Sequence, residues 1–253
     1  MYTPQDRRQN PYTDDHLLAA AGVYPGITVM NKFGRNAAVA AGVEEEIWDG
    51  SAAYSFPATA LMTKINTTID QATLQGEVVE IQGLNAAWEL TVQTAILDDS
   101  DTSTLVTLGT PLIRVFRMKL LSAVTATTSI TLVNDADNVI YGNIEPGNQQ
   151  TQMAIYTVPL GKTAYVTNYW AHHNPKAGNQ FTANPIKLKV RDNANGYAAS
   201  LAHVVGVSEN GGFQHFMGPY IKVPAQYDIY LTSQPTGADA DISAGFDLVL
   251  VDD

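Results

Sequence analysis

The sequence of 253 residues contains no cysteine. Disulfide bonds, thiolate nucleophiles and cysteine-ligated zinc or iron–sulfur sites are therefore excluded. A chain of this length can bury enough apolar surface to fold without such cross-links, as one large β-sandwich or as two modest domains. The absence of cysteine also fits a protein that folds in a reducing cytoplasm.

Charged residues are few, and most of them are acidic. They make up 15% of the chain, the formal net charge at pH 7 is −11, and the pI is near 4.7. An acidic surface repels phosphate backbones and anionic lipid leaflets, so we expect neither nucleic acid nor a membrane among the partners. No stretch approaches the roughly 20 apolar residues that a transmembrane helix needs. The N-terminal residues also lack the apolar run of an export signal.

Recognisable catalytic motifs are missing as well. The five histidines form no His-Glu-x-x-His pattern, and no Gly-x-Ser-x-Gly elbow is present. His172 and His173 are adjacent in a predicted strand, so they point to opposite faces and cannot readily share a metal ion. The acidic stretches Asp98–Asp101 and Asp135–Asn138 could offer oxygen ligands to calcium, but such residues also cap ordinary β-turns. We predict no enzyme activity, no cofactor and no metal site, with loop-bound calcium left open.

Strand patterns dominate the chain after residue 43. Short apolar runs rich in β-branched residues are separated by Gly, Pro, Asn and Asp, and helical periodicity is almost absent. The segment Trp88–Ile96 is the clearest, because Trp88, Leu90, Val92 and Ile96 alternate with polar or small residues. We expect that apolar face to lie in a core. The pattern predicts an all-β protein with a β-sandwich or jelly-roll body.

The chain divides into three regions by composition. Residues 1–43 are predicted to form an extended N-terminal arm with one short helix at Asp14–Ala21, ended by Gly22. Residues 44–145 and 146–253 are predicted as a first and a second β-sandwich region, with the turn-rich segment Tyr141–Asn148 between them. One elaborate sandwich and two tandem sandwiches both remain open.

Aromatic residues are spaced along the arm. Tyr2, Tyr12, Tyr24 and Phe33 are large apolar anchors, which solvent-exposed tails seldom carry. We therefore expect the arm to be ordered against a neighbouring subunit. The alternative is a disordered or locally packed terminus.

Two parts of the sequence resemble a known group of proteins. Asn31–Asn36, which reads Asn-Lys-Phe-Gly-Arg-Asn, is followed by an acidic run into Trp-Asp-Gly at Glu44–Ser51 and by Tyr-Ser-Phe-Pro at Tyr54–Pro57. This succession resembles a pattern in virion structural proteins of tailed bacteriophages. Ile155–Val166 is similar to the Tyr-Thr-Val-Pro-x-Gly-Lys-Thr hairpin of such proteins, with Leu160 where alanine is expected.

The resemblance implies a head decoration (cement) protein or related capsid accessory, a β-sandwich protein that is often a homotrimer. Its partners would be the major capsid protein and copies of itself, and it would lie on the capsid surface of a virion assembled in the host cytoplasm. The residues predicted to contact subunits or capsid are Tyr2, Tyr12, Tyr24, Phe33, Arg35, Trp48 and Tyr54, although core packing is the alternative for Trp48 and Tyr54.

A second prediction is a tail or fibre component that binds host glycans. Exposed aromatic residues in loops would then line the sugar site, and Tyr169, Trp170 and Phe213 are the candidates.

Overall fold

The computed structural model describes residues 15–50, 53–174, 183–208 and 211–253. Its elements are α2 (Asp15–Ala20), β1 (Ile27–Val39), β2 (Glu45–Glu46), β3 (Met62–Thr67), the 3₁₀ turn η1 (Ala72–Leu74), β4 (Val78–Asn85), β5 (Leu90–Ile96), β6 (Val106–Leu120), β7 (Ile130–Val133), β8 (Ile140–Ile144), β9 (Ile155–Thr157), β10 (Lys162–Asn174), β11 (Asn184–Asp192), β12 (Ser200–Val207), β13 (Gly212–Val223), β14 (Tyr227–Ser233) and β15 (Ala240–Asp252). Nearly all of these elements are strands, which confirms the all-β prediction.

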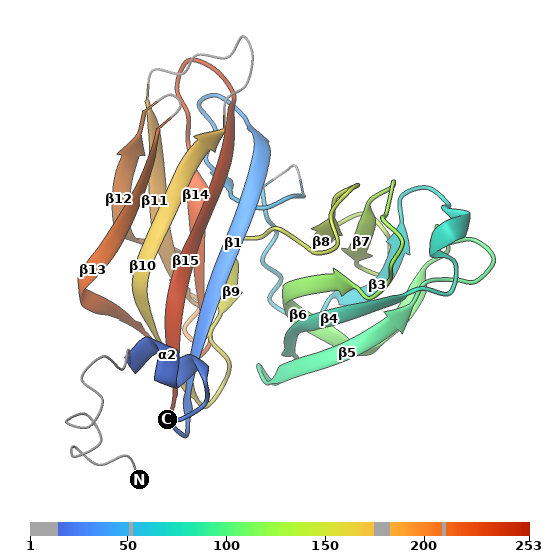
Figure 1. Cartoon of the computed structure of the whole chain (residues 1–253), viewed down its shortest axis with the longest axis horizontal. Helices are drawn as coiled ribbons and strands as arrows, with labels where there is room; N and C mark the ends of the chain where they lie inside the picture. The colour runs from blue at the N-terminus through green and yellow to red at the C-terminus, as the bar shows by residue number, and fades with distance from the viewer. Residues whose placement is uncertain (1–14, 51–52, 175–182, 209–210) are drawn as a thin grey trace.

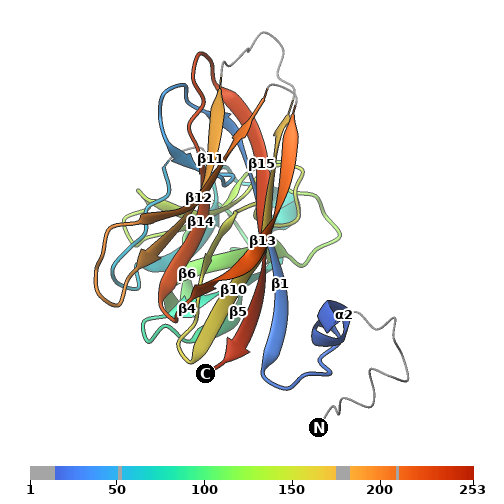
Figure 2. The same ribbon diagram turned by 90° about the vertical axis from the view of Figure 1, so that its left-hand side faces the viewer.

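Two sheets form a sandwich. The four-stranded sheet has the order β1-β15-β10-β13, and the five-stranded sheet has the order β12-β11-β14-β2, with β9 also paired to β14. Figures 1 and 2 show the two sheets stacked as layers. Their cores follow from strict alternation: in β15 the side chains from Ile242 to Leu250 at every second position are buried, and they meet β11 and β14 from the opposite sheet.

A six-stranded sheet in the order β5-β4-β6-β3-β7-β8 lies beside the sandwich (Figure 1). It is built only from Met62–Ile144, and it ends within the predicted boundary segment Tyr141–Asn148. The sandwich is less local, because β1 and β2 come from the start of the chain and pair with strands from its second half.

The structure changes two predicted details of the chain path. Residues 27–39 of the predicted arm form β1, which pairs with β15 from Ile27 to Val39, so the arm boundary at residue 43 is too late. The predicted hairpin at Ile155–Val166 is also wrong, because β9 pairs with β14 of one sheet and β10 with β13 and β15 of the other. The turn between them carries the chain across the sandwich.

The predicted short helix is present as α2, and Gly22 follows it with a φ of 72°. Backbone N–H groups of Gly22 and Val23 donate to the carbonyls of Ala19 and Leu18, which closes the helix end. The helix contacts β1 and stands off the strands on the outer side of the four-stranded sheet (Figure 2).

Candidate interaction surfaces

A buried ion pair joins the sandwich to the six-stranded sheet. Arg114 lies on β6 and is 2% exposed, and Asp228 lies on β14 and is 0% exposed. The Arg114 Nε donates to Asp228 Oδ1 at 2.8 Å, and its Nη1 donates to the carbonyl of Pro57 at 2.6 Å. Arg191 and Thr157 donate to the same carboxylate. Each charge is therefore paired and hydrogen-bonded, as burial requires.

The electrostatics of this pair favour the ionised carboxylate. Burial alone would raise the pKa of Asp228, but the charge and hydrogen bonds of Arg114, the Thr157 hydroxyl and the Arg191 charge outweigh it and hold that pKa below its usual value. Aromatic rings also contact the two arginines. The Arg114 guanidinium lies 5.2 Å from the ring centre of Trp88, and the Arg191 guanidinium lies 3.9 Å from the ring centre of Phe56. We call this contact region between the sandwich and the six-stranded sheet the joint.

The Asn-Lys-Phe-Gly-Arg-Asn segment of β1 packs against the same joint. Lys32 is buried, and its Nζ donates to the carbonyl of Phe116 on β6. A Cβ at Gly34 would lie 2.4 Å from the backbone nitrogen of Ala154 and the carbonyl oxygen of Ile47, so only glycine fits there. Asn36 donates from Nδ2 to the Glu46 carbonyl at 3.2 Å and ties β1 to β2. The segment therefore has an internal structural role.

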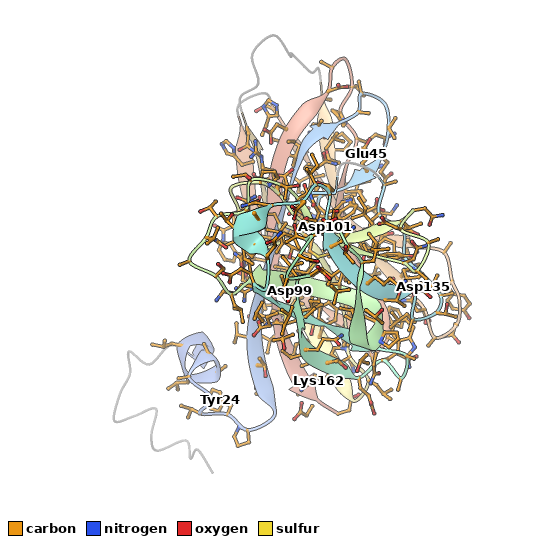
Figure 3. All side chains as sticks on the ribbon, turned by 90° about the vertical axis from the view of Figure 1, so that its right-hand side faces the viewer. Tyr24, Glu45, Asp99, Asp101, Asp135 and Lys162 are labelled. Carbon is orange, nitrogen blue, oxygen red and sulfur yellow. The ribbon has the colours of Figure 1, made fainter. Side chains whose placement is uncertain are left out.

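The predicted contact residues fall into three groups. Tyr2 and Tyr12 lie outside the described residues. Trp48 and Tyr54 are 2% and 5% exposed and pack edge to face with ring centres 5.1 Å apart, so both are core residues and neither is available at a surface. Three remain accessible: Tyr24 beside α2 (Figure 3), Phe33 at 38% exposure, and Arg35.

Arg35 lies at the edge of the sandwich in an intramolecular contact. Its Nε and Nη2 donate to the two carboxylate oxygens of Asp241 at 3.0 and 2.6 Å, while 41% of its side chain stays exposed. The bidentate geometry fixes the guanidinium and joins β1 to β15. Its predicted role in subunit contact stays a prediction.

The apolar face of β5 is turned toward solvent, which reverses the prediction for this strand. Leu90, Val92 and Ile96 are 54%, 59% and 58% exposed, whereas Ala95 on the opposite face is buried. We call these three side chains the β5 stripe. Among the described strands β5 pairs with β4 alone, so it is an edge strand, and its sequence Leu-Thr-Val-Gln-Thr-Ala-Ile contains no charge and no proline. Charged side chains and prolines normally protect an edge strand from pairing with another chain, and β5 has neither.

A second apolar surface, made of exposed and half-buried side chains, lies on the outer face of the four-stranded sheet. Strand register places Val29, Val249 and Tyr165 in one row across this face, and Phe33 and Trp170 flank Gly245 in another. Beyond them Phe216 and Tyr220 on β13 are 68% and 53% exposed. We call the set of Val29, Phe33, Tyr165, Trp170, Phe216, Tyr220 and Val249 the outer face. Clustered apolar groups of this kind are typical of protein interaction sites.

Several of the histidines and aromatic residues singled out in the sequence serve packing, whereas Trp170 is half-buried on the outer face. His172 is exposed and His173 buried, so they point to opposite faces as predicted. Tyr169, proposed for a sugar site, is instead in β10 and fully buried, with its hydroxyl 2.7 Å from Nδ1 of His203. The rings of His203 and His215 stack with centres 4.4 Å apart, which closes the sandwich edge between β12 and β13.

The acidic loops form turns. The Asp98 carboxylate accepts hydrogen bonds from the Ser100 and Asp101 backbone and the Ser100 hydroxyl, which lowers the pKa of Asp98. Asp135 accepts a hydrogen bond from the Thr63 hydroxyl at 2.8 Å. Among the described residues no three His, Asp or Glu side chains gather as a metal-ligand set. In the same part of the chain no helix is long and apolar enough to span a membrane.

Comparisons with known proteins find only weak structural likenesses. No protein-family model matches the sequence, and no curated protein matches it. Among solved structures, the chain is similar to the infectious bursal disease virus Gt strain structure at 10% identity, covering 90% of this chain and 73% of that one, with a TM-score of 0.21. It is similar to the VP2 subviral particle of that virus at 10% identity, covering 99% and 78%, with a TM-score of 0.21. It is likewise similar to T=1 particles derived from that virus, at 9% identity, covering 90% and 74%, with a TM-score of 0.19. At these scores the likenesses show neither the fold nor the function of this chain.

Proposed function

We propose that this chain is a structural component of a virus particle, a head decoration (cement) protein of a tailed bacteriophage. Its partners are the major capsid protein and copies of itself, as a homotrimer on the capsid surface of a virion assembled in the host cytoplasm. The sequence resemblance at Asn31–Pro57 points to this class. The observation that carries the proposal is the β5 stripe, because it is an exposed apolar face on an unprotected edge strand.

The β5 stripe contributes to assembly through both its side chains and its backbone. Its side chains bury apolar area, and the free edge of β5 offers backbone hydrogen bonds to an added strand. Neighbouring residues on the same face of β4 and β6 include Glu80 and Lys119, which pair across the two strands. An exposed apolar strip bordered by both charge signs suits contact with another protein.

A variant of the β5 stripe tests the proposal. Val92→Asp puts a charge where a shell contact would bury a side chain, and burial of valine is worth about 1.5–3 kcal/mol. We expect Val92→Asp to lower the affinity for the shell about tenfold to a hundredfold. The measurement is co-sedimentation with shells assembled from the major capsid protein encoded by the same genome.

Ile69→Asp is the matched control, because Ile69 is 71% exposed in the loop after β3 and lies outside the stripe. It should bind the shell like the unmodified chain. The proposal fails if the unmodified chain does not co-sediment with the shell, or if the two variants lose binding equally.

A glycan-binding tail or fibre component is the second candidate. A hollow of about 470 Å³ at the joint is lined by Trp88, by Tyr197, which is 64% exposed, and by polar groups of the β11–β12 loop. Those polar groups are already engaged: Asp192 accepts from Asn195 and Tyr227. Few polar atoms are left to orient a sugar, so this candidate ranks second. Binding on a glycan array that disappears in Tyr197→Ala would reverse the order.

A further inference from the structure

A hollow of about 320 Å³ opens on the outer face of the four-stranded sheet. It is lined by Val29, Thr167, Asn168, Phe216, Met217, Tyr220 and Asp247. The hollow arises from irregular pairing, because Val166 opposes Ile221 but Asn168 opposes Phe216, which leaves residues 217–220 of β13 without partners in β10. Such a bulge bends an edge strand and re-aims its side chains. Here it leaves Phe216 and Tyr220 exposed as walls.

The floor of the hollow is polar. The Asp247 carboxylate accepts hydrogen bonds at 2.6 Å from the side-chain amides of Asn31 and Asn168. Asn168 is 7% exposed, and its buried Oδ1 has no hydrogen-bond partner among the residues that the structure describes. An unpaired buried acceptor is costly, and a carboxylate has room for further donors. The hollow therefore suits a side chain with an apolar body and a donor at its tip, which describes tyrosine and arginine.

The N-terminal fourteen residues carry this chemistry. They include Tyr2, Tyr12, Arg7 and Arg8, and their two arginines balance two aspartates, whereas the whole chain has a net charge of −11. This segment is thus one of the least acidic parts of the protein, and its arginines complement the Asp247 carboxylate.

The position and length of the segment also fit the outer face. It joins the described chain at Asp15, where α2 stands on the outer side of the four-stranded sheet (Figure 2). Fourteen extended residues reach about 46 Å, and a thirteen-residue strand such as β15 spans about 43 Å. The segment is therefore long enough to cross the face of a sheet.

The exposure of α2 bears on whether the N-terminal segment binds its own chain or a second copy. Leu17 in α2 is 65% exposed and Val23 after it is 40% exposed, so these two apolar side chains are not covered by the chain's own sheet, although Ala19 between them is buried. A neighbouring copy placed against α2 would cover them. We propose that the hollow on the outer face receives a tyrosine or arginine from residues 1–14 of a second copy of this chain. The proposal deepens the assembly function and rests on it, because the copies must meet side by side.

Disulfide trapping tests the proposal in the full chain, whose lack of cysteine leaves no background thiol. The test variants are Tyr12→Cys with Tyr220→Cys, and Tyr2→Cys with Tyr220→Cys. We expect at least one pair to oxidise into oligomers on a non-reducing denaturing gel, and reduction to dissolve them. The control pairs Tyr12→Cys or Tyr2→Cys with Leu201→Cys, which is 55% exposed on β12 of the other sheet and should give no such oligomers.

Equal cross-linking in test and control variants, an intramolecular disulfide, or no disulfide would each overturn the inference. A second measurement uses Phe216→Ser, with Leu201→Ser as its control. Light scattering should show a smaller mass for Phe216→Ser alone, with thermal unfolding confirming that both variants fold. Co-sedimentation of the unmodified chain with shells reports on the proposed function separately, so failure of one idea is distinguishable from failure of the other.

Discussion

Arg114→Met is expected to lower the free energy of unfolding by about 3–5 kcal/mol, because it leaves Asp228 buried without its main partner. Asp228 is fully buried, and Arg191 alone would then compensate its charge. The substitution also leaves the carbonyl of Pro57 without its donor. Urea unfolding followed by tryptophan fluorescence measures the loss, since Trp88 lies over the Arg114 guanidinium.

A double variant separates the pair from its surroundings. Arg114→Met with Asp228→Leu removes both charges and should recover much of the loss, because a buried pair replaced by apolar groups is often neutral. Lys162→Met is the control, since Lys162 pairs with Asp252 where both side chains are partly exposed, and it should cost less than about 1 kcal/mol. An Arg114→Met variant as stable as the unmodified chain would contradict the account of the joint.

The stability of the joint should also depend on pH through Asp49 and Lys32. Burial, with a smaller effect of the Glu145 charge, raises the pKa of Asp49 to about 8. Burial, assisted by the Arg117 charge, lowers the pKa of Lys32 to about 7. The Asp49 Oδ2 accepts a hydrogen bond from the backbone N–H of Gln152, and within the described part of the chain Asp49 Oδ1 has no hydrogen-bond partner.

The signs of the two effects are opposite. A raised carboxyl pKa means that the folded chain binds the extra proton between pH 3.8 and about 8, so this contribution to stability falls as pH rises through that window. A lowered lysine pKa means that the unfolded chain binds the extra proton between about 7 and 10.5, so stability rises with pH there. The contribution of the two groups is therefore smallest near pH 7–8.

Matched variants isolate each effect. The free energy of unfolding of the unmodified chain minus that of Asp49→Asn should fall between pH 5 and 8, by up to about 1.4 kcal/mol per pH unit. The free energy of unfolding of the unmodified chain minus that of Lys32→Met should rise between pH 8 and 10. Urea titrations at these pH values supply the numbers, and a pH-independent difference for both variants would refute this assignment.

The sequence predicted the strands well because alternation is a local property. It identified β5 as an amphipathic strand, but the pattern does not say what covers the apolar face. The alternation predicts a core position for Leu90 and Val92, because a single chain usually buries such a face. In the structure Gln93 from the other face bonds to the Thr110 backbone inside the curled sheet, which fixes the stripe outward.

The sequence does not predict which distant segments pair as neighbouring strands. β1 contains a buried lysine, a glycine and an asparagine, so its sequence does not predict a core strand. Its partner β15 begins about two hundred residues later, so no local pattern links the two. Nothing local links Arg114 to Asp228 or marks Phe216 as a wall of the hollow. The joint and the outer face became visible only when the strands were assembled.

The most direct test of the central claim is the mass of the purified unmodified chain in solution, measured by light scattering over a range of concentrations. If the outer face is a contact between copies, the chain should form a stable oligomer, and a homotrimer would have three times the 27.3 kDa of one chain. Phe216→Ser should then reduce that mass, whereas Val92→Asp, in the proposed shell contact, should leave it unchanged. A monomer of 27.3 kDa at every concentration would contradict the account of an assembly protein.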